Sequence, residues 1–285
     1  MYRQIVAGTD LSKTARIATD RAAWLAGTLG AELILVHAGS DPGPHFKELA
    51  ESYGAEARVV SGNPAEALIG EAERTDAGLL IVGSVGMRGA RRFLLGNVPN
   101  KVSHHATRDL LIVKTDPPGH EGGYRSLLVG TDGSDTAMKA VDAACALAKE
   151  LGIRATIACA YEPPSKAELD ALRSDPNDPI ALWQQDSATR STPDEFRWRI
   201  AGAAQAEDVL DRAAERAARA GAPAETRAIQ GPAAEAILDV AEREDFDLIV
   251  VGNIGMTGAQ RMMLGNVPHR ISHHSPTDVL IVRTG

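Results

Sequence analysis

The 285-residue sequence has few aromatic side chains, two cysteines and no long basic tract. Because aromatic residues make up only 4% of the chain, its cores must be built mainly from Ala, Val, Leu and Ile. The formal net charge of -8 argues against nucleic acid or an anionic membrane as the main partner. No apolar run reaches the length that spans a bilayer. These absences favour a globular protein with a small-molecule or protein partner.

Neither the cysteines nor the beginning of the chain indicates an extracellular protein. Cys145 and Cys159 stand in apolar contexts, far from any cluster of His and Cys. We therefore expect both to be buried packing residues rather than redox or metal-binding groups. A strand expected from about residue 3 leaves no room for a signal peptide, so a soluble cytoplasmic protein is the expectation.

One glycine-rich segment occurs twice. Gly83-Ser84-Val85-Gly86 is followed by nine residues and then Gly96-Asn97-Val98-Pro99. Near the C-terminus, Gly252-Asn253-Ile254-Gly255 is followed by nine residues and then Gly265-Asn266-Val267-Pro268. Over half of the positions from 83 to 113 recur at 252 to 282. The chain therefore consists of two duplicated halves.

Strand and helix patterns alternate through both halves. The expected strands cover residues 2–8, 31–38, 55–60, 78–82 and 110–113, then 126–130, 153–160, 226–230, 248–251 and 279–282. The expected helices cover 14–29, part of 41–53, 64–74, 97–106, 135–151, 205–220, 232–243 and 266–275. Ser12, Asn63 and Ser134 suit helix N-caps, and Gly30 and Gly152 suit helix ends. Continuous apolar strands separated by helices predict an α/β fold with two tandem, open, doubly wound, parallel five-stranded sheets.

The same pattern defines the expected domains. The first covers residues 1–115, a linker rich in Pro and Gly covers 116–123, and the second domain covers 124–285. The second domain contains an insertion at about 161–200, with Trp183, Phe196 and Trp198. Because the crossover at 41–53 is short, we expect part of the first sheet to be thinly covered. The hypothesis is that the insertion, or a second chain, covers it.

The glycine segments have the character of a phosphate-binding site. Each follows an apolar strand and precedes a helix, where glycines allow close backbone approach and the helix N-terminus attracts an anion. Thr9-Asp10 and Thr131-Asp132, at the end of each first strand, project to the same sheet edge. The alternative is that these glycines serve only as turns. The segments match neither a Walker loop nor the Gly-x-Gly-x-x-Gly fingerprint.

These features resemble the universal stress protein family in a tandem, two-domain form. The resemblance is carried by 6–10 with Ser12, by 129–132 with Ser134, and by both copies of Gly-x2-Gly-x9-Gly. It implies binding of ATP or another adenine nucleotide, with Mg2+ as a candidate companion. The implied binding residues are Gly8, Thr9, Asp10, Ala38, Gly83, Gly86, Gly96, Asn97 and Val98, and then Gly130, Thr131, Asp132, Ala160, Gly252, Gly255, Gly265, Asn266 and Val267.

Within that resemblance, the glycine motifs would hold the phosphates. Asp10 and Asp132 would lie near the ribose or a divalent cation, and the backbone at Ala38 and Ala160 would contact adenine. The alternative for both aspartates is a local hydrogen bond to backbone amides. The family often has Ser or Thr after the last glycine, where this chain has Asn in both halves. An Asn amide donates hydrogen bonds as well, so the choice among ATP, AMP and a cyclic nucleotide stays open.

Other polar groups near the motifs have two interpretations each. The His104-His105 and His273-His274 pairs are expected to be helix-face residues, because adjacent helical side chains diverge too far to chelate one metal ion easily. The arginines within the two glycine segments, Arg88, Arg91, Arg92 and Arg261, either reach phosphate or are simply solvated.

The favoured function is a nucleotide-binding stress or regulatory protein, in which occupancy alters a partner surface. The resemblance implies that the two halves associate about a pseudo-twofold axis and that chains pair further into a homodimer. The alternatives are a slow ATPase or nucleotide-transferring enzyme, and a protein-interaction scaffold without ligand. The sequence argues against the enzyme, because it shows no nucleophile–His pair, no Walker lysine and no paired carboxylates at spaced motif positions.

Overall fold

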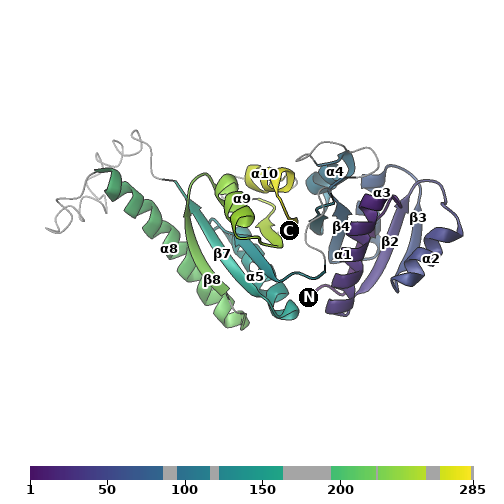
Figure 1. Ribbon diagram of the computed structural model, residues 1–285, viewed down its shortest axis with the longest axis horizontal. Helices are drawn as coiled ribbons and strands as arrows, with labels where there is room; N and C mark the ends of the chain where they lie inside the picture. Colours follow the sequence, from purple (N-terminus) through teal and green to yellow (C-terminus); the bar gives the residue numbers. More distant parts are fainter. Residues whose placement is uncertain (86–94, 116–121, 163–193, 223, 255–263, 284–285) are drawn as a thin grey trace.

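The computed structural model describes residues 1–85, 95–115, 122–162, 194–222, 224–254 and 264–283, with side chains in the second long helix of the second half given from residue 202 (Figure 1). The first half contains β1 (Gln4–Gly8), α1 (Lys13–Leu29), β2 (Glu32–Ala38), α2 (Pro44–Ser52), β3 (Glu56–Val60), α3 (Pro64–Arg74), β4 (Leu79–Gly83), α4 (Asn97–His105) and β5 (Asp109–Val113). The second contains β6 (Ser126–Gly130), α5 (Asp135–Leu151), β7 (Arg154–Tyr161), α8 (Asp194–Ala220), β8 (Ala224–Gln230), α9 (Ala233–Arg243), β9 (Leu248–Gly252), α10 (Asn266–His274) and β10 (Asp278–Val282). The expected alternation of strands and helices is confirmed.

The described strands form a single sheet in the order β3-β2-β1-β4-β5-β10-β9-β6-β7-β8. Within each half, neighbouring strands are parallel, and β1 lies between β2 and β4. In the second half, β6 likewise lies between β7 and β9. Each half is therefore the expected doubly wound parallel sheet, with a change of winding direction at its first strand.

The two halves meet through an antiparallel strand pair that joins their sheets. In β5 and β10, Leu111 lies opposite Leu280, within a register that runs from Ile112 to Leu110. Both strands would otherwise be sheet edges with unpaired backbone groups, and pairing them satisfies those groups in the centre of the molecule. The expectation of two tandem sheets thus holds for each half, while the structure adds their union into one sheet.

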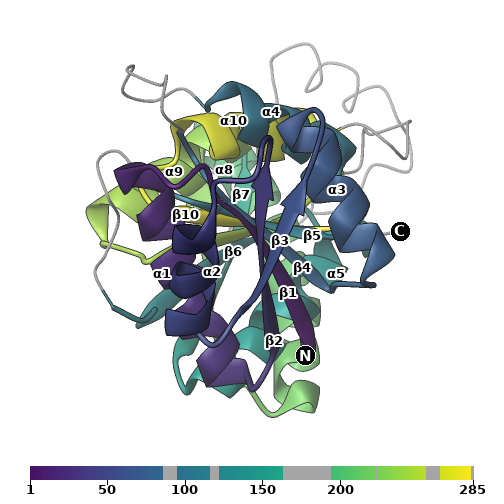
Figure 2. The same cartoon turned by 90° about the vertical axis from the view of Figure 1, so that its right-hand side faces the viewer.

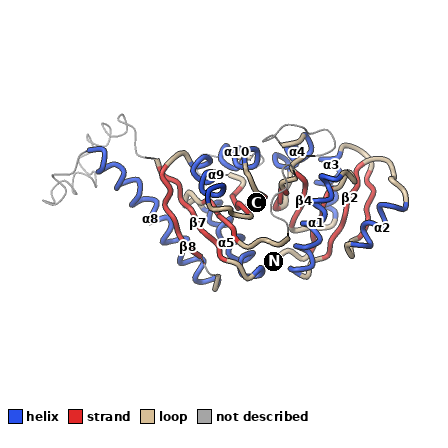
Figure 3. The backbone as a smooth tube through the Cα atoms, viewed as in Figure 1, coloured by secondary structure: helices blue, strands red, loops and turns tan. Residues whose placement is uncertain are grey.

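Helices cover both faces of this sheet. The core on one face is formed with α1, α2, α5 and α8, and the core on the other with α3, α4, α9 and α10. Figure 2 shows α1 and α2 on one face of the first half and α3 on the other. Figures 1 and 3 show α4 and α10 next to each other above the middle of the sheet. The central strands β4, β5, β9 and β10 are apolar along most of their length because both of their faces are buried, whereas the edge strands β3 and β8 carry charged residues.

Local capping explains where the long helices begin and end. Ser12 accepts a hydrogen bond from the backbone N–H of Ala15, and Gly30 ends α1 in the left-handed conformation with φ of 63°. Ser134 and Gly152 do the same for α5, with φ of 68° at the glycine. A glycine adopts this conformation without the steric cost that a Cβ brings. The caps expected from the sequence are confirmed.

The short crossover of the first half covers part of its sheet. Phe46 and Ala50 of α2 are fully buried in the core, and α2 packs on β3. Helix α8 begins at Asp194 rather than near residue 205, and it packs on β7, β8 and α5 at the opposite end of the molecule from α2 (Figure 1). Edge strand β3 nevertheless contains no buried residue, and Val59 is 42% exposed, so part of the first sheet is thinly covered as expected. That the insertion or a second chain covers this part stays a prediction. Trp183 and the side chains of Phe196 and Trp198 lie outside the described residues.

The two cysteines are buried and unpaired. Cys145 is 1% exposed and Cys159 is 5% exposed. Burial raises the pKa of the Cys145 thiol to about 11 and also raises the pKa of Cys159. The expected packing role is consistent with this placement, because a buried thiol with a raised pKa reacts poorly. Among the described helices, none combines the length and apolar character needed to cross a bilayer.

Candidate functional site

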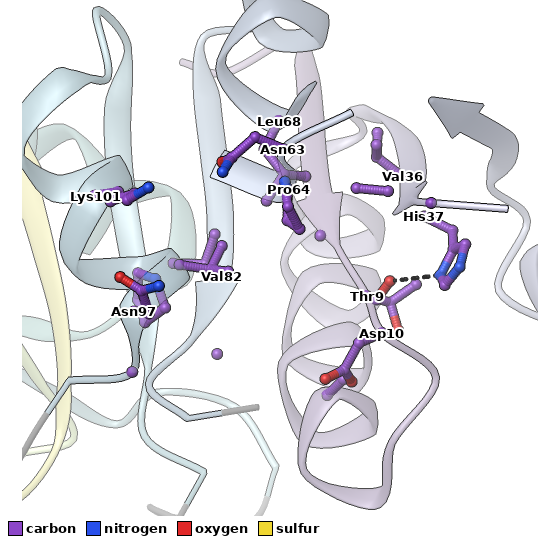
Figure 4. A pocket seen from close by; sticks show the side chains of 18 of the residues that line it. Thr9, Asp10, Val36, His37, Asn63, Pro64, Leu68, Val82, Asn97 and Lys101 are labelled. Carbon is purple, nitrogen blue, oxygen red and sulfur yellow. Dashed lines mark hydrogen bonds between the residues drawn. The ribbon is translucent and has the colours of Figure 1, made fainter. Parts of the chain in front are cut away.

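A cavity of about 680 Å³ opens at the carboxyl ends of β1, β2 and β4. At this edge the chain leaves β1 toward α1 and leaves β4 toward α4, on the opposite face, which separates the two connections. Figure 4 shows Lys101 and Asn97 of α4 on one side of the cavity, and Thr9, Asp10 and His37 on the other. The sheet topology therefore places polar groups from distant segments around one hollow.

The structure gathers the candidates of the first half around this cavity. Eight of them line it, namely Gly8, Thr9, Asp10, Ala38, Gly83, Gly96, Asn97 and Val98. Gly86 lies outside the described residues, as do Arg88, Arg91 and Arg92. The lining thus joins the end of β1, the end of β2, the end of β4 and the first turn of α4, as a nucleotide site at this edge requires.

The backbone at the start of α4 presents N–H groups to the cavity. Gly96 is the N-cap, and its own N–H donates to the carbonyl oxygen of Ser84 over 2.8 Å. The N–H groups of Asn97 and Val98 belong to the first turn of α4, where a helix offers them no acceptor of its own. The N-terminal end of the helix dipole adds a positive field at the same point. An anion is therefore favoured next to Asn97 and Val98.

The glycines of the motif are required by packing as well as by any ligand. A Cβ on Gly83 would lie 3.2 Å from Cγ2 of Thr115, and one on Gly96 would lie 3.4 Å from the carbonyl oxygen of Ser84. A Cβ on Gly8 would lie 2.7 Å from Cδ1 of Leu68. The contacts at Gly8 and Gly83 are closer than a Cβ normally makes, so these two glycines let neighbouring elements approach, whereas the distance at Gly96 is an ordinary contact.

Asp10, the aspartate after β1, forms a local hydrogen bond with the backbone, as one of its two interpretations predicted. Oδ1 of Asp10 accepts a hydrogen bond from the N–H of Ser12 over 3.0 Å, while Oγ1 of Thr9 accepts one from Leu11 over 3.1 Å. Leu11 adopts a positive φ of 63°, which is uncommon for a residue with a branched side chain. The loop between β1 and α1 is therefore held by side chains that also line the cavity. A role of Asp10 toward ribose or a cation stays a prediction.

Several lining residues were not among the sequence candidates, and Lys101 and His37 are two of them. Lys101 stands on α4 one turn after Asn97, and the helical spacing between them was the signal that could have found it. His37 lies on β2, and its Nδ1 is 3.1 Å from the carbonyl oxygen of Thr9. Since a carbonyl oxygen only accepts, the Nδ1 atom is the donor, which leaves Nε2 as an acceptor in the neutral ring.

The start of α3 forms another wall of the cavity. Asn63 caps α3 through Oδ1, which accepts from the N–H of Ala65 over 3.1 Å, and Pro64 follows at the first helical position. Both line the cavity. The sequence predicted this cap correctly. Its place in the site was missed because only the sheet topology shows that β3 ends at the same edge.

The second half places its candidates at the corresponding positions. Gly130, Thr131 and Asp132 follow β6 or end it, Ala160 lies near the end of β7, Gly252 ends β9, and Gly265, Asn266 and Val267 start α10. Asp132 accepts from the N–H of Ser134 over 3.0 Å, as Asp10 does from Ser12. Gly265 donates to the carbonyl oxygen of Asn253 over 2.8 Å. Gly255 and Arg261 lie outside the described residues.

The histidine pairs lie where α4 and α10 face each other. The rings of His104 and His269 are 5.5 Å apart, and those of His269 and His273 are 4.3 Å apart. Nε2 of His273 is 3.1 Å from Oδ1 of Asn100. Burial, together with nearby His269, lowers the pKa of His273 to about 4 and lowers that of His104. Within the described ranges, no group of His, Cys, Asp and Glu side chains is arranged to hold a metal ion.

Comparison with known proteins points to one family. The model of the universal stress protein family matches residues 1–58, 47–114 and 123–283. The universal stress protein Rv1636 of Mycobacterium tuberculosis is 36% identical over 162 residues, which are 56% of this chain and 97% of that protein.

Solved structures were compared with the chain as well. A universal stress protein from Archaeoglobus fulgidus matches over 99% of both chains, with a TM-score of 0.64 and 18% identity, which supports the fold alone. A universal stress protein crystallised in complex with cAMP is 32% identical and covers 57% of this chain and 100% of its own, with a TM-score of 0.40.

Proposed function

Since the chain belongs to the universal stress protein family, we propose that it binds an adenine nucleotide at the carboxyl edge of its sheet. One observation carries the proposal: eight residues nominated from the sequence line a single cavity that the N-terminus of α4 borders. The volume of about 680 Å³ falls within the range of sites for small ligands and cofactors.

In this proposal, each part of the nucleotide has its own place in the cavity. The phosphates would lie against the N–H groups of Asn97 and Val98, with the ammonium group of Lys101 one turn further along α4. The base would lie at the end of β2, next to Ala38 and His37. Backbone N–H groups, a helix dipole and one cation together stabilise a multiply charged anion.

A divalent cation fits the chemistry of the lining. Mg2+ is commonly held by one or two carboxylates together with phosphate oxygens, and Asp10 supplies one carboxylate to the cavity. When bound, the ion would neutralise part of the phosphate charge. Asp10, in a loop ordered by its own bond to Ser12, is the residue of this chain that would hold it.

The proposed role is regulatory: occupancy would alter a surface that a partner recognises. ATP as the preferred nucleotide, a cytoplasmic location, pairing into a homodimer and the domain limits 1–115 and 124–285 belong to this proposal. Slow hydrolysis of ATP is the alternative.

The direct test is to release and identify whatever the purified protein carries. Gentle denaturation followed by mass spectrometry is expected to release ATP or AMP, and isothermal titration with ATP, AMP and cAMP is expected to rank them. GTP serves as the control for the base. Sustained phosphate release that disappears in the double variant Asp10→Ala, Asp132→Ala would favour the enzyme instead. Absence of binding for every nucleotide would leave a scaffold.

A further inference from the structure

The two halves carry the same nucleotide-binding residue types in different surroundings. The first bay is the cavity at the ends of β1, β2 and β4 and the start of α4. The second bay is the corresponding region at the ends of β6, β7 and β9 and the start of α10. Because the halves are duplicates, each position of one bay has a counterpart in the other, and differences between counterparts are informative.

The cation at the start of the last helix is available in one bay and occupied in the other. Lys101 on α4 and Arg270 on α10 are counterparts, one turn after Asn97 and Asn266. Arg270 forms an ion pair with Glu235 of α9. Lys101 lines the first bay and forms no ion pair with any carboxylate in the part of the chain that the structure describes. Only the first bay therefore offers its cation to a phosphate without first breaking an ion pair.

A hydrogen bond bridges the wall of the second bay. Oγ1 of Thr136, in the first turn of α5, donates to the carbonyl oxygen of Ile254 over 2.9 Å. The carbonyl oxygen of Thr136 also lies 3.2 Å from the position that a Cβ on Gly252 would take. In the first half, the counterpart of Ile254 is Val85, whose carbonyl oxygen is approached instead by Oγ1 of Thr115 at 3.5 Å. A hydrogen bond therefore joins the start of α5 to the segment that follows β9.

The base end of the second bay is covered by α8. Tyr161 stands where the first half has Gly39, which lines the first bay. A Cβ on Gly202 of α8 would lie only 3.1 Å from Cδ2 of Tyr161. One on Gly133 would lie 2.8 Å from Cγ2 of Val209, so α8 also presses on the loop after β6. In the first half the corresponding helix, α2, begins only at Pro44 and leaves the end of β2 facing the cavity.

From these three differences we infer that the chain binds one nucleotide, in the first bay, and that the second bay is closed to it. The inference rests on the proposed function. A nucleotide entering the second bay would have to separate Arg270 from Glu235, release Thr136 from Ile254 and displace the ring of Tyr161 or α8. Each of these changes opposes binding, and none of them is required in the first bay. The duplicated glycine motif is thus retained in both halves, while one half binds.

The experiment counts nucleotides per chain and uses a matched pair of variants. Native mass spectrometry and isothermal titration of the full chain with ATP and with AMP are expected to give one nucleotide per chain. Lys101→Glu should weaken binding by about tenfold or more, because it reverses a charge beside the phosphates. Arg270→Glu, the same change at the counterpart position, should leave the affinity within about twofold. Circular dichroism checks that both variants fold.

The outcomes separate the two proposals. Two nucleotides per chain, or an affinity loss in Arg270→Glu comparable to that in Lys101→Glu, would overturn the single-site inference and leave nucleotide binding in place. Absence of binding of ATP, AMP and cAMP by the unaltered protein would overturn the proposed function itself. One nucleotide per chain with equal affinity in Lys101→Glu and the unaltered protein would also count against the first bay.

Discussion

The backbone N–H of Lys114 donates a hydrogen bond of 2.7 Å to Oδ1 of Asp278, although the two residues belong to different halves of the chain. The reciprocal bond, also 2.7 Å, runs from the N–H of Arg283 to Oδ1 of Asp109. Asp109 and Asp278 are the first residues of β5 and β10. Each accepts a hydrogen bond from the backbone N–H of the residue that follows the other strand. The antiparallel pair is therefore clamped at both ends, with approximate twofold symmetry.

The clamp at Asp278 also holds a buried cation. Its Oδ2 accepts a hydrogen bond of 2.8 Å from the hydroxyl group of Tyr124 and pairs with Nε of Arg21 at 3.2 Å. Both Arg21 and Asp278 are almost fully buried, and the guanidinium lies 4.5 Å from the centre of the Tyr124 ring. Removing one partner of such a pair leaves the other charge buried without compensation.

We therefore expect Asp278→Ala to lower the free energy of unfolding by about 3–5 kcal/mol, as for other broken buried pairs. Urea denaturation followed by circular dichroism measures this change. Asp109→Ala is the matched control. Asp109 accepts hydrogen bonds from Tyr2 and from the backbone N–H of Arg283. Among the described contacts, its carboxylate has no ion pair like the one between Asp278 and Arg21. A smaller loss is expected there. Equal losses in both variants would refute a special role for Arg21.

The contact between α4 and α10 should weaken in acid. Burial and the neighbours His269, His274, His104 and Lys114 lower the pKa of His273 to about 4, below the ordinary value of about 6.5 for an unfolded chain. The unfolded state then binds more protons between these values, so the stability contributed by neutral His273 is complete above pH 6.5. It falls as the pH decreases toward 4.

His273→Gln is expected to reduce this pH dependence, because glutamine does not titrate. The measurement is the urea midpoint at intervals from pH 7 to pH 4, for the variant and for the unaltered protein. His274→Gln, on the exposed side of the same helix, is the control and should follow the unaltered protein. Parallel pH profiles for all three proteins would show that His273 is not involved.

Asn97 provides a test of the phosphate position that does not disturb packing. Its side chain is exposed at the start of α4 and lines the cavity. Asn97→Asp should weaken ATP binding by about tenfold or more, since a carboxylate would face the phosphates. Asn97→Ser, which keeps a donor and a helix-compatible side chain, should change affinity by no more than a few fold. Isothermal titration distinguishes the two, and an Asp variant that binds as tightly as Ser would contradict the assignment.

The cysteines should be unreactive in the folded protein. Cys145, with a pKa of about 11, and Cys159, with a pKa also raised by burial, carry little thiolate at pH 8 and are almost inaccessible. A colorimetric disulfide reagent is expected to label neither within minutes, and to label both after addition of urea. Rapid labelling before urea would show that one of the cores opens easily.

Short stretches of sequence predict much of this fold. The apolar strands, the caps at Ser12 and Asn63, the helix ends at Gly30 and Gly152, and the two glycine motifs are local signals, because caps and left-handed glycines act within one turn of the chain. The carboxyl edge of the sheet follows from alternating strands and helices. Candidates such as Asp10 and Gly96 therefore follow from the sequence alone.

Other features depend on residues that meet only in the folded chain. No local pattern distinguishes an edge strand that stays free from one that pairs, so the union of β5 with β10 required Asp278 to meet Lys114, and Asp109 to meet Arg283. The same holds for the inequality of the bays. Lys101 and Arg270 are similar cations in similar motifs, and Glu66 on α3 is the counterpart of Glu235 on α9. They differ because Arg270 pairs with Glu235, while the described contacts include no such pair between Lys101 and Glu66. The order of strands and helices in the sequence thus determined which residues could form a site. Contacts between residues far apart in the chain determined which of the two bays stays open.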